Sequence, residues 1–158
     1  MTRAIYQGGS RTAQLDPVMR ELLPVLRYFY LAFTQPTSNV WRHGYQAAIG
    51  TWGEARGLAI AHAGQKFVHD LTGCGLVMPA FIDPLNIEKR DILTSDEARI
   101  LLLLCYMGAD DVARARDIIA SLNQGRVDPS LVRHGLALSA HLDPAHATRV
   151  VPRLTLVS

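Results

Sequence analysis

Cysteine and lysine are scarce in this sequence, and its charges nearly balance. Its 158 residues include two cysteines, Cys74 and Cys105, which form no disulfide framework and no C-x-x-C pair, so we expect buried free thiols. Lysine occurs at two positions against fourteen arginines, a bias that, with the abundant alanine and leucine, is typical of GC-rich bacterial genomes. A net charge of +2 is too small to indicate nucleic acid or an anionic membrane as a partner.

Long apolar runs are absent as well. Charged residues interrupt every stretch before it reaches the roughly 20 apolar residues that a membrane span requires. Residues 1–9 contain one arginine and no apolar core of the kind found in a signal peptide. Walker, Rossmann and nucleophile-elbow motifs are also missing, which removes the common nucleotide-binding and hydrolase interpretations. We therefore expect a cytoplasmic, non-enzymatic protein, and we assign no catalytic residue and no cofactor.

Apolar periodicity indicates an all-α protein. Apolar residues make up 49% of the chain and charged residues 19%, as in globular domains. At this length the pattern predicts one domain, a compact bundle of five or six helices over residues 15–148. A mobile arm at 1–14 is expected to precede it, and an extended tail at 149–158 to follow it.

The stretch 39–73 is the organising element of this prediction. Large residues recur there every three or four positions, as on one face of a helix. The stretch is predicted to form one long helix, or two nearly collinear helices with a break near Gly50–Gly53. We expect three of its large side chains to pack on the C-terminal helices: Trp41, Trp52 and Phe67.

A strip of small residues follows the same stretch at helical spacing. Such a strip lets a second backbone approach closely. The second backbone belongs either to the same domain, which is the favoured interpretation, or to another copy of the chain in a homodimer. The glycines concerned are Gly50, Gly53, Gly57 and Gly64.

Start signals place the other helices. Asp16-Pro17 combines an N-cap acid with proline at the first helical position and predicts a helix to about Phe33. Pro24 inside it should kink the helix or move its start. Thr94 and Glu97 form a capping box that opens a helix through a run of leucines, the expected centre of the core. Acidic residues open two further helices, near 110–123 and 129–142.

Two expectations concern the ends of these helices. Residues 76–92 contain two prolines, so we expect an ordered loop there, packed down by residues such as Phe81 and Ile82. In the last two helices, Val112 is expected to face inward and Leu136 to help fill the core.

Histidines offer a metal- or haem-binding alternative. His62 and His69 lie seven residues apart, as do His134 and His141, so each pair shares a helical face at about 10.5 Å along the axis. One metal ion cannot take both ligands of such a pair, because metal–ligand bonds are near 2 Å. A site would need a ligand from elsewhere, and the candidate set is His62, His69 and Cys74. Structural histidines are the favoured interpretation.

A DNA-binding alternative comes from residues 94–142, which have some similarity to a helix-turn-helix. The last helix would read the bases. Two features count against this interpretation, because the second helix is too long and the turn before the third is too extended. The residues that would contact DNA are Arg126, Ser130, Arg133 and His134.

The favoured interpretation is a bacterial adaptor or regulatory module that acts through protein–protein contacts. Its partner would be another protein or a second copy of the chain. A DNA-binding regulator and a metal- or haem-binding protein are the alternatives.

Overall fold

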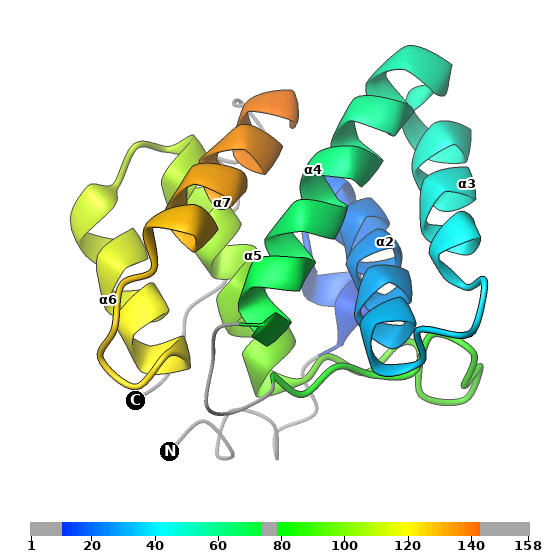
Figure 1. Ribbon diagram of the computed structural model, residues 1–158, viewed down its shortest axis with the longest axis horizontal. Helices are drawn as coiled ribbons and strands as arrows, with labels where there is room; N and C mark the ends of the chain where they lie inside the picture. Colours follow the sequence, from blue (N-terminus) through cyan, green and yellow to red (C-terminus); the bar gives the residue numbers. More distant parts are fainter. Residues whose placement is uncertain (1–10, 74–78, 143–158) are drawn as a thin grey trace.

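Six α-helices and one short 3₁₀ turn make up the fold of the residues that the structure describes (Figure 1). The computed structural model describes residues 11–73 and 79–142. Within them there is no strand, and one isolated antiparallel bridge joins Arg11 to Ile92. The prediction of an all-α bundle of five or six helices is confirmed. The elements in chain order are η1 (Thr12–Gln14), α2 (Pro17–Thr34), α3 (Trp41–Trp52), α4 (Glu54–Gly73), α5 (Ser95–Gly108), α6 (Val112–Leu122) and α7 (Pro129–His141).

The helices form two groups of three. In the first group α2, α3 and α4 pack against one another, and in the second α6 and α7 each pack against α5. The groups are joined because α4 lies beside α7 and α2 touches α5 (Figure 1). Among the described helices, α6 is the one that packs extensively against a single neighbour, α5. None of the described helices is both long and apolar enough to span a membrane.

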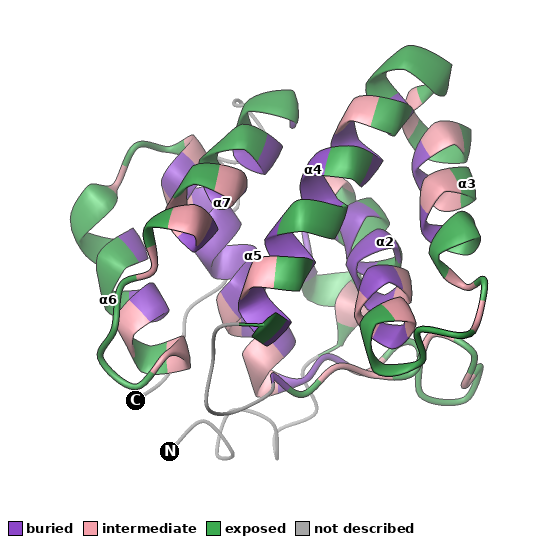
Figure 2. Cartoon of the chain, viewed as in Figure 1, coloured by how far each residue is buried: buried purple, intermediate pink, exposed green. Residues whose placement is uncertain are grey.

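The core follows the surfaces on which the two groups meet, and Figure 2 shows buried positions on their facing sides. Every side chain from Ile100 to Cys105 on α5 is buried, so the run of leucines does occupy the centre of the core. Phe67 of α4 is fully buried and reaches α7, where a Cβ added to Gly135 would lie 3.1 Å from its ring. The expected packing of Phe67 on the C-terminal helices is confirmed.

A chain reversal at Gly53 separates α3 from α4. Gly53 has a φ of +83°, in the left-handed region that favours glycine. The two helices then pack against each other as a hairpin. A Cβ at Gly57 would lie 2.6 Å from the Ile49 Cα, so glycine is what permits this close approach. The break near Gly50–Gly53 is confirmed, and the alternatives of one long helix or two collinear helices are wrong.

The hairpin also corrects the expected position of Trp41. Because the chain reverses, α3 lies at the outer edge of the molecule, on α2 and α4 (Figure 1). Trp41 is 40% exposed and meets the Tyr45 ring edge-on at 5.9 Å between centroids. Its expected packing on the C-terminal helices is wrong. Trp52 is partly buried against the core.

Helix α2 begins where its start signal predicts. Asp16 is the N-cap, and its Oδ2 accepts a hydrogen bond from the Val18 N–H at 3.1 Å. Pro24 does not move the start, because the helix continues through it. Pro24 lies on the exposed side, where water can hydrogen-bond the carbonyl that proline leaves without a donor.

A buried ion pair joins α2 to the start of α5. Arg27 and Glu97 are 3% and 0% exposed, and their side chains form two parallel hydrogen bonds of 2.8 Å, from Nε to Oε1 and from Nη2 to Oε2. Arg27 also donates to the carbonyls of Arg90 and Ile92, both at 2.7 Å. Glu97 also accepts from the backbone N–H groups of Ile82 and Thr94. The capping-box glutamate predicted from the sequence is therefore also one half of a fully hydrogen-bonded buried pair.

The expected loop between α4 and α5 is confirmed over residues 79–92, which contain no helix or named strand. It is held down from both sides. The Thr94 hydroxyl donates to the Ala80 carbonyl at 2.6 Å, and Phe81 stacks on Tyr30 with centroids 4.4 Å apart. Burial of Tyr30, and then the charge of Asp96, raise the pKa of its hydroxyl above the usual 10.0.

The ends of the chain are only partly described. In the predicted arm, Thr12–Gln14 form η1, and the Thr12 N–H donates to the Asp91 carbonyl at 3.0 Å. Residues 1–10 of the arm, 74–78 of the loop and everything after 142, including the predicted tail, lie outside the described residues.

Two glycines give a matched test of the α3–α4 hairpin. Gly57→Ala should destabilise the protein by about 1–3 kcal/mol, because its methyl group would overlap the backbone of α3. Gly50→Ala, where nothing lies within 4 Å, should stabilise it by up to roughly 1 kcal/mol through helix propensity. Urea denaturation measures both. Equal effects of the two substitutions would contradict the close approach.

The buried pair predicts strong coupling between two distant positions. Arg27→Met or Glu97→Leu should each lower the free energy of unfolding by about 3–5 kcal/mol, because each leaves a buried charge without its partner. The double variant should lose much less than the sum of the two. Arg114→Met, which removes an exposed pair to Asp111 at 3.7 Å, is the control and should cost at most about 1 kcal/mol. Additive losses in urea denaturation would refute the coupling.

Candidate functional site

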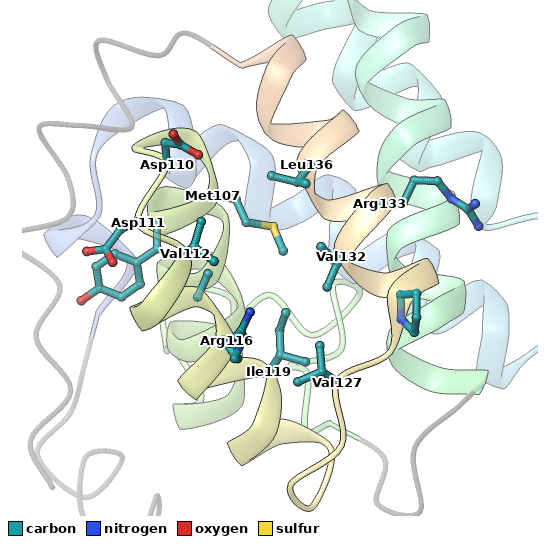
Figure 3. A pocket seen from close by; sticks show the side chains of 13 residues that line it. Met107, Asp110, Asp111, Val112, Arg116, Ile119, Val127, Val132, Arg133 and Leu136 are labelled. Carbon is teal, nitrogen blue, oxygen red and sulfur yellow. The ribbon is translucent and has the colours of Figure 1, made fainter.

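A groove opens between α6 and α7 above the end of α5 (Figure 3). Its volume is about 670 Å³, within the range of roughly 300–1,000 Å³ that is typical of binding pockets. The end of α5 forms the floor, and the two following helices form the walls. The lining is mostly apolar and consists of Tyr106, Met107, Asp110, Asp111, Val112, Ala115, Arg116, Ile119, Val127, Pro129, Val132, Arg133 and Leu136.

The turns on either side of α6 place the two walls. Asp110, with a φ of +58°, turns the chain before the N-cap Asp111 starts α6. After α6 the chain reverses through Gln124 and Gly125, with φ of +52° and +86°, and the N-cap Asp128 starts α7. The two helices thus run in opposite directions (Figure 1). Both rest on α5 without packing extensively on each other, which leaves the groove between them.

Apolar side chains that the sequence places in the core are exposed in this groove. Val112 is 60% exposed and Leu136 46% exposed, so both expectations of burial are wrong. The reason is that the face of each helix that carries them lines the groove and meets no other helix among the described residues. Val127, in the connection, is 44% exposed beside them.

The spacing of apolar residues on α7 is a sequence signal for this second face. On α7, Leu131 and Leu138 lie seven residues apart and are buried against the core. Val132 and Leu136 lie four residues apart on a different face and line the groove. A short helix with two separate apolar faces has more apolar surface than one core can bury.

Charged groups stand at the edges of the groove. Asp111 accepts a hydrogen bond from the backbone N–H of Arg114 at 3.2 Å. The Asp111 carboxylate also forms an exposed ion pair with the Arg114 side chain. The Arg114 guanidinium lies 5.7 Å from the centre of the Tyr106 ring. Asp110 and Arg116 are exposed on the same side of the groove.

The predicted metal ligands do not meet in the part of the chain that is described. His62 and His69 are exposed on α4, and His69 lies edge-on to Phe33 with centroids 6.2 Å apart. Cys74 lies outside the described residues. Within 11–73 and 79–142, no group of three or more histidine, cysteine, aspartate or glutamate side chains could hold a metal ion.

The residues of the DNA-binding alternative differ in their exposure and contacts. His134 faces α4, where its Nδ1 contacts Oδ2 of Asp70, and both side chains are partly buried. Arg133 donates to the Ser130 hydroxyl at 3.2 Å and points away from the groove (Figure 3). Arg126 is exposed in the connection before α7. His134 is therefore engaged with α4, whereas Arg126 and Arg133 remain exposed.

The glycines of the homodimer alternative divide into two pairs. Gly57 and Gly64 are buried inside the chain, the first against α3 and the second 3.5 Å from Leu26, measured from an added Cβ. Gly50 and Gly53 are exposed, with nothing within 4 Å of an added Cβ. Only the exposed pair remains accessible to a second copy.

Cys105 is a buried thiol, as the sequence predicts. Its side chain is fully buried in α5. Burial, and then the charge of Asp16, raise its pKa from the usual 9.0 to about 12. Because a thiolate is the reactive form, this cysteine is a poor nucleophile at neutral pH.

No protein family model matches the chain, and neither the curated proteins nor the solved structures include one that is significantly similar to it. The site must therefore be interpreted from its geometry.

The raised pKa of Cys105 predicts a pH dependence of stability. Between pH 9 and about 12 the unfolded chain loses the thiol proton and the folded chain keeps it. The unfolded state then binds fewer protons, so the free energy of unfolding falls as pH rises through this window, by at most about 1.4 kcal/mol per pH unit. In a Cys74→Ser background, Cys105→Ala should flatten the decline. Parallel pH profiles in urea denaturation would refute this assignment.

Proposed function

We propose that this chain is a non-enzymatic adaptor or regulatory protein that binds a helix of another protein, or of a second copy of itself, in the α5–α6–α7 groove. The observation that carries the proposal is the gathering of exposed apolar side chains in one concave place, since Val112, Val127 and Leu136 all line it. Apolar concavities with polar edges are typical of interaction sites. The bacterial cytoplasm expected from the sequence belongs to the same proposal.

The dimensions of the groove favour a helix as the occupant. The α6 wall extends from Val112 to Ile119 and the α7 wall from Pro129 to Leu136. Each wall is therefore about 10.5 Å long, or two helical turns. An amphipathic helix that docks in a groove presents anchors at i, i+3 or i+4, and i+7, which cover the same length.

Backbone hydrogen bonding favours a helix over an extended peptide. An extended peptide gains affinity by pairing with an exposed strand edge, and residues 11–73 and 79–142 contain no strand to offer one. A helix satisfies its own backbone groups before it is buried. A bound helix would also pack against the apolar faces of α6 and α7 that line the groove.

Site-specific photo-crosslinking in cells of the source organism tests this proposal. A benzophenone amino acid at Leu136 should form one or a few discrete adducts, whereas the same group at Leu58 of α4 should not. The two positions are 46% and 42% exposed, so they are matched in access to solvent. An adduct at twice the mass of the chain would identify the partner as a second copy.

A charge in the groove should abolish these adducts without unfolding the protein. Val127→Asp places a carboxylate in the groove, in the connection between α6 and α7, and because Val127 is exposed its cost in stability should be within about 0.5 kcal/mol. The crosslinker at Leu136 should then give no discrete adduct. Adducts that are the same at Leu136 and Leu58, or that survive Val127→Asp, would refute docking in this groove.

A further inference from the structure

Two charged side chains beside the groove have no partner within the described residues. They lie at different positions along the groove. Asp110 stands at the end where α5 turns into α6, and Arg116 lies further along α6 toward Val127 (Figure 3). Both residues are exposed. Neither side chain makes a hydrogen bond or ion pair to another residue of 11–73 or 79–142. Both are therefore available to an occupant of the groove.

The other charges that line the groove are already engaged. Asp111 caps α6 and pairs with Arg114. Arg133 donates to Ser130, and its guanidinium points away from the cavity (Figure 3). The charge pattern that an occupant meets is therefore acidic at the Asp110 end and basic beside Arg116.

We infer that the occupant is an amphipathic helix with a cationic last turn beside Asp110 and an acidic first turn beside Arg116. The inference rests on the proposed docking function. A helix is itself stabilised by acidic residues in its first turn and by cationic residues in its last turn. Only this direction lets one helix satisfy both its own dipole and the charges of the groove. The occupant thus runs antiparallel to α6.

Two synthetic peptides of identical composition test the inference. The first is an alanine-based helix with leucines at i, i+3 and i+7, glutamates in its first turn and lysines in its last. The second exchanges the glutamates and lysines. The two peptides differ in intrinsic helicity, so their affinities for one protein cannot be compared directly. The quantity to measure is the ratio of the two affinities, obtained by fluorescence titration at low salt. This ratio is then compared between wild type and each variant. The helicity of each peptide cancels in that comparison.

Two variants should change this ratio. Arg116→Glu should lower the preference for the first peptide by roughly three- to tenfold, because it replaces an attraction between exposed charges with a repulsion. Asp110→Asn should lower it by roughly two- to fivefold, and asparagine tolerates the left-handed backbone at this position. Asp117→Asn, an exposed neighbour on α6 that does not line the groove, is the control and should leave the ratio unchanged.

The outcomes separate this inference from the proposal beneath it. Leucine peptides that bind wild type but keep the same affinity ratio in Arg116→Glu would overturn the charge assignment and leave docking intact. Leucine peptides that bind no better than versions with alanine in place of leucine would overturn docking itself. A ratio that shifts as expected at low salt and converges as salt is raised would support the inference.

Discussion

The ion pair between Arg27 and Glu97 is the interaction on which the rest of the structure depends. Each buried ion loses hydration worth several kcal/mol, which only complete hydrogen bonding can offset. Arg27 makes four hydrogen bonds and Glu97 accepts four. These bonds reach α2, α5 and both ends of the loop between α4 and α5. The pair therefore fixes a long irregular segment against the core without any regular structure in the segment itself.

Local chemistry explains which parts of this fold were predictable. Asp16-Pro17, Thr94 with Glu97, and Asp128-Pro129 determine helix starts through atoms at most three residues apart, and all three starts are confirmed. The Arg27–Glu97 pair joins residues that are 70 positions apart in the sequence. No local sequence pattern specifies a contact over such a separation. The same limit applies to α3. Its position at the outer edge depends on the chain reversal at Gly53, and the sequence around this glycine is equally compatible with a simple break in a longer helix.

The sequence pattern does not predict the groove, for a related reason. A helical wheel tells which side chains share a face, but not whether that face has a neighbour. Val112 and Leu136 have the composition of core residues and become surface only because α6 and α7 diverge over α5. In the other group of helices, Gly57 brings α3 and α4 into close contact. A small residue therefore permits the close packing of α3 on α4, whereas large apolar residues face the groove between α6 and α7.

Helix α6 packs extensively on α5 alone, and non-glycine residues with positive φ flank it at Asp110 and Gln124. Such a helix has the features of a separate unit of local opening: little shared core and two connections in a backbone conformation that most residues avoid. Its amides should exchange with deuterium through a sub-global opening that leaves α2, α4 and α5 protected. An occupant of the groove would bind the closed form of α6, so slower exchange in this one helix would report occupancy even before the occupant is identified.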